Sequence, residues 1–469
     1  MPTSMPPIPP LEIVRYYDTS LTSTNAKNLL FLGDGFAQND GDLFDSAVEQ
    51  ITRRIFEGNN PPFSFREIRN KFIVYKAFIP STTSGISCAS SIDNQGRPTE
   101  SNTGDRLTEK NSALGLQYIG KNSRVITQKT NDELLIPKII QRLTHPHEKH
   151  TNSAVPQCWE RPIPSPTMTP YLGKDYGLVV VLINDDLHGG STLVHPQSTN
   201  STYPYFATAV SLGRKNFFNL VINPSSNLID HDPASSTRKW WNQTASIVLH
   251  ELGHSSFSLG DEYEEFSTQS IAASIGIDIA NTSNYFSTVQ CWRNLVTAED
   301  ILDIEHIMVD PAKLDNLKWN KAQLYPGSSK GLISQRVLDY LKGSIPDLPP
   351  LPLYIRDITT CMSDKLDSES KFPPETLWTK LSNQQWKNNN RTADLIGLYE
   401  GGGGYGCGIY RPAGRCKMRE SSLSDSFDFS KRDLRSTDFC FVCMYLIVEQ
   451  IDPSVLQELD RYYLDPEGR

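Results

Sequence analysis

The chain has 469 residues, of which 38% are hydrophobic and 21% charged, and its formal net charge is −9. This length allows one large domain or two ordinary ones with an ample core. The acidic balance, without any basic run, argues against nucleic acid or an anionic membrane as partner, and no stretch has the apolar length of a transmembrane helix.

The N-terminal lead, residues 1–25, is Pro-rich. Residues 1–10 lack the apolar core of a signal peptide, so we expect either an intracellular chain or one whose leader has been trimmed. Asn-x-Ser/Thr sequons would suit a secreted glycoprotein, but they are common by chance and leave the compartment open. They lie at Asn200, Asn242, Asn281 and Asn390.

A strand–helix–strand pattern follows the lead. Residues 28–32 predict a short apolar strand, and the Gly33-Asp34-Gly35 sequence after it lacks the lysine and hydroxyl of a phosphate-binding loop, which indicates a turn. Apolar residues then recur with helical period between residues 43 and 55, and residues 72–79 predict a second strand. The pattern is typical of a βαβ unit with a parallel pair of strands.

The next hundred residues are less regular. Residues 81–130 are rich in Ser, Thr, Asn and Gly and are interpreted as a long surface insertion, and residues 132–143 predict a helical piece. Residues 178–183, all Leu, Val or Ile, predict a central strand covered on both faces, and residues 217–222 predict another strand. Three histidines in a Pro-containing loop are interpreted as solvated rather than metal-binding: His145, His147 and His150.

The sequence His250-Glu251-Leu252-Gly253-His254 has the spacing of a zinc site on a helix. Residues four apart lie one above the other, so both imidazoles can reach one ion, while Glu251 lies about 100° round the helix, near a water on that ion. Zinc lowers the pKa of a bound water to roughly 7, and Glu251 would accept its proton and pass it to the leaving amine. The alternative is a core helix whose histidines are satisfied by hydrogen bonds.

The helix around this motif has recognisable ends. Asp232-Pro233 is typical of a helix N-terminus, and Gly260 is typical of a helix end. Apolar residues on opposite faces of the helix predict that it is buried all round. In a continuous helix Asp261 would lie about 16 Å along the axis from His250, but a break at Gly260 lets the chain turn back and makes Asp261 the predicted third ligand. The reserve is Glu262, and the less favoured alternatives, on a second helix further on, are Glu299 and Glu305.

The C-terminal half has weaker periodicity. Residues 332–341 predict a helix, residues 345–353 an extended Pro-rich crossing, and residues 439–451 an apolar helix. The glycine run at residues 401–404 has two interpretations: a flexible linker, or a close approach of the backbone to a ligand or to the floor of the metal site.

The eight cysteines are too dilute for a disulfide scaffold. Cys440-x-x-Cys443, with Cys407 and Cys416, could form a second, structural zinc site. One or two disulfides near the C-terminus are the favoured interpretation, and ordinary buried thiols are a third.

Four blocks in the chain together resemble the IgA-specific metalloendopeptidase family of zinc peptidases, which is similar in plan to the metzincins. The resemblance spans most of residues 29–452. The blocks are Leu-Phe-Leu-Gly-Asp-Gly-Phe ending at Phe36, His-Glu-Leu-Gly-His through Gly-Asp-Glu-Tyr ending at Tyr263, Tyr-Glu-Gly-Gly-Gly-Gly-Tyr through Ile-Tyr-Arg-Pro ending at Pro412, and Cys416-Lys417-Met418-Arg419 with Phe439-Cys440-x-x-Cys443.

The resemblance implies a role for each matching residue. His250 and His254 would bind zinc with Asp261 as third ligand, and Glu251 would be the catalytic glutamate. Met418 would form the methionine turn beneath the metal. The tetrahedral oxyanion would be held with help from Tyr405 or Tyr410. The family is mostly secreted, so secretion is suspected, although the sequence shows no signal peptide.

We therefore expect an α/β (α+β) fold of zincin or metzincin type. Residues 26–265 would hold a mixed twisted sheet and the active-site helix, and residues 266–469 a less regular C-terminal subdomain. The expected activity is that of a zinc-dependent endopeptidase whose protein or peptide substrate lies extended against an edge strand. The alternative is a non-catalytic protein- or glycan-binding module on the same fold with a structural metal. A glycan hydrolase using Asp261 and Glu262 is less favoured, because neighbouring carboxylates do not imply the separation that glycosidases need.

Overall fold

The computed structural model divides into two compact units, the described residues up to Phe257 and those from Leu259 onwards. It describes residues 11–22, 26–57, 63–89, 91–92, 98–99, 110, 112–119, 125–128, 178–185, 188–194, 206–212, 233–257, 259–262, 292–297, 300, 302–303, 308–309, 313, 318–319, 399–403, 405–412, 416–418 and 439–459.

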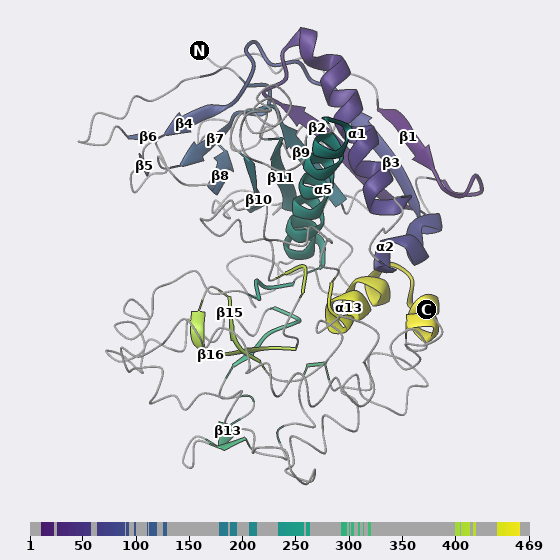
Figure 1. Cartoon of the computed structure of the whole chain (residues 1–469), viewed down its shortest axis with the longest axis vertical. Coiled ribbons are helices and arrows are strands. Elements are labelled where there is room, and N and C mark those ends of the chain that lie inside the picture. The colour runs from purple at the N-terminus through teal and green to yellow at the C-terminus, as the bar shows by residue number, and fades with distance from the viewer. Residues whose placement is uncertain are drawn as a thin grey trace, which may run out of the picture. The chain divides into compact units, whose positions relative to one another are not determined.

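A six-stranded sheet in the order β1-β3-β2-β9-β11-β10 forms the centre of the first unit (Figure 1). The four inner strands are parallel, whereas β1 and β10 pair antiparallel with their neighbours, so the predicted mixed sheet is confirmed. The strands are β1 (Glu12–Tyr16), β2 (Lys27–Asp34), β3 (Phe72–Ala77), β9 (Leu178–Ile183), β10 (His188–Val194) and β11 (Phe206–Leu212).

The first three core elements follow the sequence prediction closely. Helix α1 (Gly41–Phe56) lies between the parallel strands β2 and β3, as the βαβ pattern predicts. Strand β9 is buried at every residue and lies between β2 and β11, which confirms a central strand.

Strands β10 and β11 were not predicted. The predicted elements at residues 132–143, 217–222, 332–341 and 345–353 and the histidine loop at residues 145–150 lie outside the described residues.

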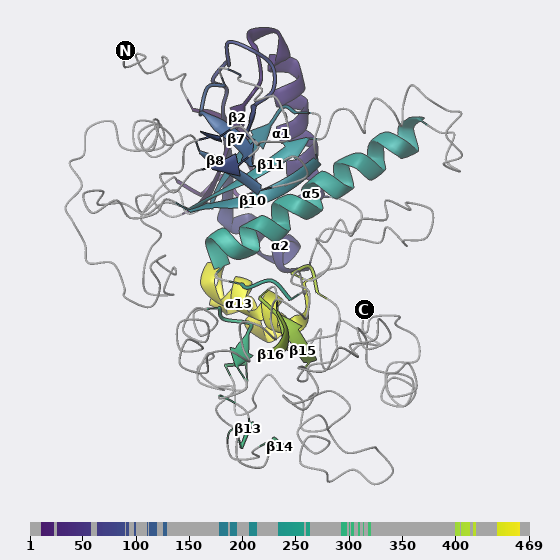
Figure 2. The same cartoon turned by 90° about the vertical axis from the view of Figure 1, so that its left-hand side faces the viewer.

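Two helices cover one face of the sheet (Figures 1 and 2). Helix α5 (Pro233–Phe257) packs against α1 and against β9, β10 and β11. Phe44, Val48 and Ile51 of α1 are fully buried at three- and four-residue spacing, the pattern of a helix with one face on a core. The short helix α2 (Phe63–Ile68) follows α1, and its Phe65 contacts Phe257 at the end of α5 with ring centroids 6.1 Å apart.

The other face of the sheet is covered by part of the supposed surface insertion. Leu114, Leu116 and Tyr118 are buried in one cluster with Leu30 and Val181 of the central sheet. The interpretation of residues 81–130 as a surface insertion is therefore wrong for this part, because a few apolar side chains in a polar stretch suffice to cover a sheet face. The strands here are β4 (Ser87–Ala89), β5 (Ser91–Ile92), β6 (Pro98–Thr99), β7 (Leu116–Ile119) and β8 (Val125–Gln128).

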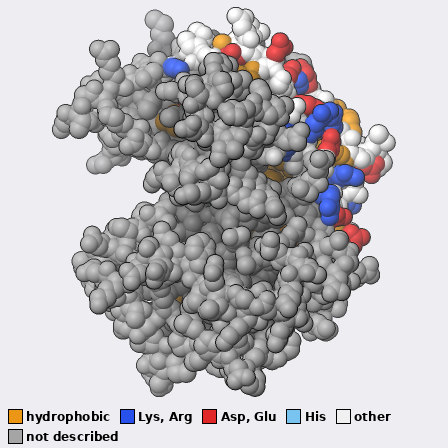
Figure 3. Space-filling model, in the orientation of Figure 1, with side chains coloured by type: hydrophobic (Ala, Val, Ile, Leu, Met, Phe, Trp, Pro, Cys, Tyr) orange, Lys and Arg blue, Asp and Glu red, His pale blue; other side chains and the backbone are white. Residues whose placement is uncertain are grey.

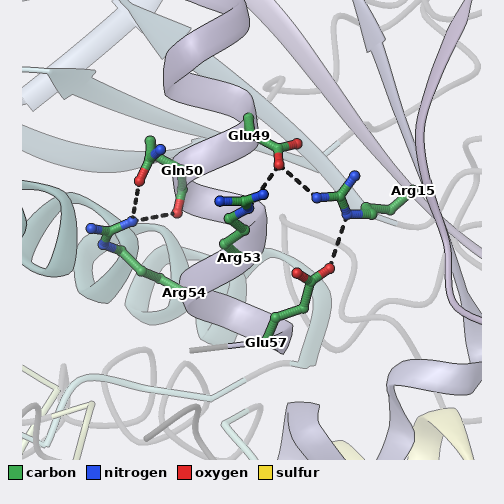
Figure 4. A network of polar contacts seen from close by, with 6 residues as sticks. All are labelled: Arg15, Glu49, Gln50, Arg53, Arg54 and Glu57. Carbon is green, nitrogen blue, oxygen red and sulfur yellow. Dashed lines mark hydrogen bonds and ion pairs between the residues drawn. The ribbon is translucent and has the colours of Figure 1, made fainter. Parts of the chain in front are cut away.

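The solvent face of α1 carries mixed charge. Arg15 on β1 binds both Glu49, at 2.6 Å, and Glu57, at 2.9 Å, and Arg53 also binds Glu49, at 2.8 Å (Figure 4). Basic and acidic side chains are interspersed over the described surface visible in Figure 3. The network therefore ties the outermost strand β1 to the C-terminal half of α1.

The second unit has less regular structure among its described residues. A three-stranded sheet has the order β12-β16-β15, and a separate pair is formed by β13 and β14. These strands are β12 (Val296–Thr297), β13 (Leu302–Asp303), β14 (Met308–Val309), β15 (Tyr399–Gly402) and β16 (Tyr405–Arg411).

Helix α13 (Phe441–Ile451) confirms the predicted apolar C-terminal helix, and its residues up to Val448 are all buried. Arg293, in the loop before β12, forms a 2.6 Å ion pair with Glu449, which anchors that loop to α13. None of the described helices combines the length and the apolar character needed to cross a bilayer.

Candidate metal sites

Helix α5 presents the His-Glu-x-x-His motif from a buried surface. It begins at Pro233, where the missing amide hydrogen costs nothing, and ends at Phe257. Between residues 244 and 257 every residue is buried except Ser246 and His254, which are partly exposed. The prediction of burial all round is therefore confirmed for this segment, whereas Asn242, earlier in the helix, is exposed. A 2.9 Å hydrogen bond between the hydroxyls of Thr208 on β11 and Ser255 fixes the rotation of the helix on the sheet.

The two histidines of the motif lie on one side of α5. Their Nε2 atoms are 3.1 Å apart, and the rings are nearly perpendicular, at 89°, with centroids 4.7 Å apart. Two nitrogens bound to one tetrahedral Zn²⁺ would be about 3.3 Å apart, given metal–nitrogen bonds of about 2.0–2.1 Å. The side chains of His250 and His254 therefore fit a shared ion without rearrangement.

Glu251 lies between helix α5 and β10, the edge strand of the sheet at the end opposite to β1. Its side chain is 8% exposed. A methyl group at Gly190 on β10 would lie 2.5 Å from Ile247 Cγ2, 2.8 Å from Glu251 Cγ and 3.0 Å from Glu251 Oε1. The backbone of β10 can thus pass this close to the glutamate only because residue 190 is glycine.

The third predicted ligand lies just beyond the end of α5. The ligand atoms of His250, His254 and Asp261 lie within 4.8 Å of one another. Glu262, the reserve candidate, instead belongs to a separate group with three cysteines. This division follows from the extended chain, in which successive side chains point in opposite directions. The other candidates, Glu299 and Glu305, lie outside the described residues.

Asn294 holds the turn that carries these two carboxylates, and nothing in the sequence singled it out. Its Oδ1 accepts a 2.6 Å hydrogen bond from the Gly260 amide, and its Nδ2 donates to the Gly260 carbonyl at 3.0 Å and to Glu262 Oε1 at 2.9 Å. A Cβ at Gly260 would come within 2.6 Å of Leu295 and 2.7 Å of Trp292. Gly260 is therefore needed for close packing as well as for ending the helix.

The glycine run packs against the same turn. The Gly403 amide donates a 2.6 Å hydrogen bond to the Asp261 carbonyl, and a Cβ at Gly402 would lie 3.3 Å from that oxygen. Gly401 and Gly403 have φ of 99° and 61°, in the region that favours glycine. The flexible-linker interpretation is wrong: the run joins β15 to β16 and supports the backbone of the candidate third ligand.

The remaining predicted residues are also in the second unit. Met418 is fully buried in a turn, and its carbonyl accepts a 2.9 Å hydrogen bond from the Glu262 amide, beside Asp261. Tyr410 is fully buried on β16. Tyr405 begins the same strand, and its side chain lies outside the described residues.

A second group of potential ligands is formed by Glu262, Cys416, Cys440 and Cys443. All four are buried, and their ligand atoms lie within 4.8 Å of one another. The three cysteines are free thiols, so the expected disulfides near the C-terminus do not form among them. Cys407, the other cysteine considered for such a site, has its side chain outside the described residues.

Burial dominates the electrostatics of this group. It raises the pKa of the Glu262 carboxyl and of the Cys416 and Cys443 thiols well above their usual values. Burial acts in the same direction on Cys440, but hydrogen bonds from Cys416 and Cys443 outweigh it and lower the pKa of Cys440 to about 7.

Neither a scan against protein-family models nor a search of curated proteins found a match to this chain.

Proposed function

We propose that the protein is a zinc-dependent endopeptidase of zincin type, related to the IgA-specific metalloendopeptidases. The observation that carries the proposal is the 3.1 Å separation of the two Nε2 atoms, with the buried Glu251 between them on the same helix. A helix with satisfied core histidines would need neither a glutamate there nor a glycine on the strand facing it. Asp261 supplies the third ligand.

Zinc held by His250, His254 and Asp261 would polarise the scissile carbonyl and make a water more acidic. Glu251, which lies on the same helix and against β10, would accept the proton of that water and deliver it to the leaving amine. The Gly403 amide and the Met418 carbonyl bind the two polar groups of the peptide bond between Asp261 and Glu262, and so restrain the backbone at the third ligand.

Strand β10 is where an extended peptide would bind. It is the last strand in the hydrogen-bonded order of the sheet, and its Gly190 adjoins Glu251. A substrate paired with this strand through its main chain would lie alongside the catalytic carboxylate.

The proposal is tested with wild type, Glu251→Gln and the double variant His250→Ala/His254→Ala. Glu12→Gln, an exposed change on β1, is the matched control. We expect wild type and control to cleave a mixed denatured-protein substrate, as read from new N-termini by mass spectrometry. Glu251→Gln should keep the zinc at the histidines but lose about 10²–10⁴-fold in rate, and the double variant should lose both that zinc and the activity.

Two outcomes would contradict the peptidase assignment. Equal cleavage by wild type and Glu251→Gln would show that the glutamate has no catalytic role. A wild type that retains zinc at the histidines but cleaves nothing would instead favour the non-catalytic binding module.

A further inference from the structure

We propose that Glu262, Cys416, Cys440 and Cys443 form a second metal site, which binds a structural Zn²⁺ within the second unit. The group is closed, with four ligand atoms within 4.8 Å of one another and all four residues buried. A closed set of four protein ligands is the hallmark of structural rather than catalytic zinc. The inference does not depend on the peptidase activity.

The distances within the group suit a tetrahedral ion. Cys443 Sγ lies 3.2 Å and Cys440 Sγ 4.0 Å from Glu262 Oε1. Around a zinc ion with usual bond lengths, a sulfur and a carboxylate oxygen would be about 3.6 Å apart, which falls between these values. Cys416 Sγ also accepts a 3.2 Å hydrogen bond from the amide of Cys440, the residue that precedes α13.

A disulfide or an ordinary thiol core explains the group less well. A disulfide would use two of the three sulfurs and leave the third thiol beside a buried carboxylate. Glu262 Oε2 is buried and has no hydrogen-bond partner, whereas Oε1 accepts from Asn294. A carboxylate taken from water is costly unless it is paired or coordinates a metal. Thiolates select soft or borderline ions, which favours Zn²⁺ over Mg²⁺ or Ca²⁺.

The site would join three segments that are distant in the sequence. Glu262 follows the turn at Gly260, Cys416 lies in the turn of Met418, and Cys440 and Cys443 are at the start of α13. The Cys443 and Glu262 ligands are 181 residues apart. Because the described part of this unit contains few regular elements, a metal cross-link would supply stability that its secondary structure does not.

The same cross-link would position the third ligand of the first site. Glu262 is the neighbour of Asp261, and its amide is bonded to Met418, two residues from Cys416. Fixing Glu262 by a metal therefore fixes the backbone from which Asp261 extends. This consequence, unlike the second site itself, rests on the proposed function.

The test isolates the second site by emptying the first. Zinc is counted by elemental analysis in purified full-length protein, and Co²⁺ is then exchanged in and followed by absorption. We expect about two zinc ions per wild-type chain and about one in His250→Ala/His254→Ala. The cobalt form of that double variant should show thiolate-to-metal charge transfer and the intense visible bands of tetrahedral geometry.

Cys440→Ser/Cys443→Ser should lose both the second zinc and the thiolate bands, whereas Cys88→Ser on β4, in the first unit, should keep them. If the double cysteine variant does not fold, alkylation of the wild type decides the question. Cys416, Cys440 and Cys443 should resist alkylation in the native zinc form and react after chelation.

Two results would overturn the second site. One is a disulfide between any two of these three cysteines in protein purified without reductant. The other is a histidine double variant that binds no metal and shows no thiolate bands. A chain with thiolate bands but no zinc at the histidines would overturn the peptidase proposal and leave this one intact.

Discussion

Gly190 and Glu251 lie so close that no side chain fits between them. A Cβ at Gly190 would be 2.8 Å from Glu251 Cγ and 3.0 Å from its Oε1. Both residues belong to the first unit: Gly190 is on the edge strand β10, and Glu251 is on helix α5, which packs against β10. A residue larger than glycine at position 190 would therefore press against the side chain of Glu251.

Gly190→Ala should displace both Ile247 and Glu251, and lower activity more than stability. Overpacking a tight contact typically costs about 1–3 kcal/mol, whereas a displacement of about 1 Å at a reacting group can cost about 100-fold in rate. The measurements are kcat/KM on a peptide substrate and the melting temperature. Gly189→Ala on the same strand, which faces the other way by strand alternation, is the control. Equal activity losses in both variants would show that the effect comes from the strand and not from Glu251.

Asp261→Asn and Glu262→Gln should affect different metal ions, although the residues are adjacent. Asp261→Asn should weaken zinc binding at the histidines by at least about tenfold, because even residues that merely orient a ligand contribute that much, while the thiolate bands of the cobalt form stay unchanged. Glu262→Gln should alter those bands. Chelator competition and cobalt absorption measure the two effects. Loss of the bands in Asp261→Asn would reverse the assignment of the carboxylates.

The sequence predicted best those features that a local pattern can carry. Apolar periodicity placed α1 and α13, and a run of Leu, Val and Ile placed β9. The spacing of His250 and His254 predicted that both imidazoles lie on one side of a helix, because that spacing is a property of the helix itself.

The features missed by the sequence depend on contacts between distant segments. Strands β10 and β11 contain Gly, Ser, Thr and Ala, and they become strands through pairing with β9 and with each other. Asn294 acts on backbone atoms 34 residues away. The Cys-x-x-Cys pair pointed to a metal or a disulfide, but its carboxylate partner could not be found without the fold.

Asn294→Ala should destabilise the second unit. The side chain is fully buried and makes three hydrogen bonds, and its loss deprives the buried Gly260 amide and carbonyl of this partner, whereas Glu262 Oε1 still has Cys443 Sγ at 3.2 Å. Each buried polar group left unsatisfied costs about 1–3 kcal/mol, so we expect a loss of roughly 2–5 kcal/mol, measured by denaturant unfolding. The control is Asn242→Ala, since Asn242 is exposed on α5 and accepts one bond from Arg54. Similar losses in the two variants would contradict this role.

Asp34 should make the first unit less stable as the pH rises towards neutrality. Burial raises the pKa of its carboxyl to about 6, against the opposing effect of hydrogen bonds from the Leu114, Leu116 and Gly35 amides. Below about pH 4 the group is protonated in both the folded and the unfolded chain. Between about pH 4 and 6 the unfolded chain releases its proton first, so the contribution of Asp34 to stability falls and is lost above its folded pKa.

Asp34→Asn tests this directly. The pKa difference corresponds to roughly 3 kcal/mol, so the stability of wild type relative to the variant should fall by about that amount between about pH 4 and 7. Melting temperatures of both proteins across this range provide the measurement, and titrations common to both proteins cancel in the difference. A difference that stays constant with pH would show that the folded pKa of Asp34 is not raised.

Arg15→Ala should have a small, salt-dependent effect. Arg15 joins Glu49 and Glu57 and so ties β1 to α1, but all three side chains are about 30% exposed (Figure 4). Exposed ion pairs contribute about 0–1 kcal/mol each and are screened by salt. We expect a loss of about 1 kcal/mol at low ionic strength that largely disappears at about 1 M salt, read from melting temperatures. Arg66→Ala, which removes a pair with the adjacent Glu67, should cost less because that pair joins no separate elements. A loss for Arg15→Ala that persists in high salt would instead show that its aliphatic stem, packed between strand and helix, provides the stabilisation.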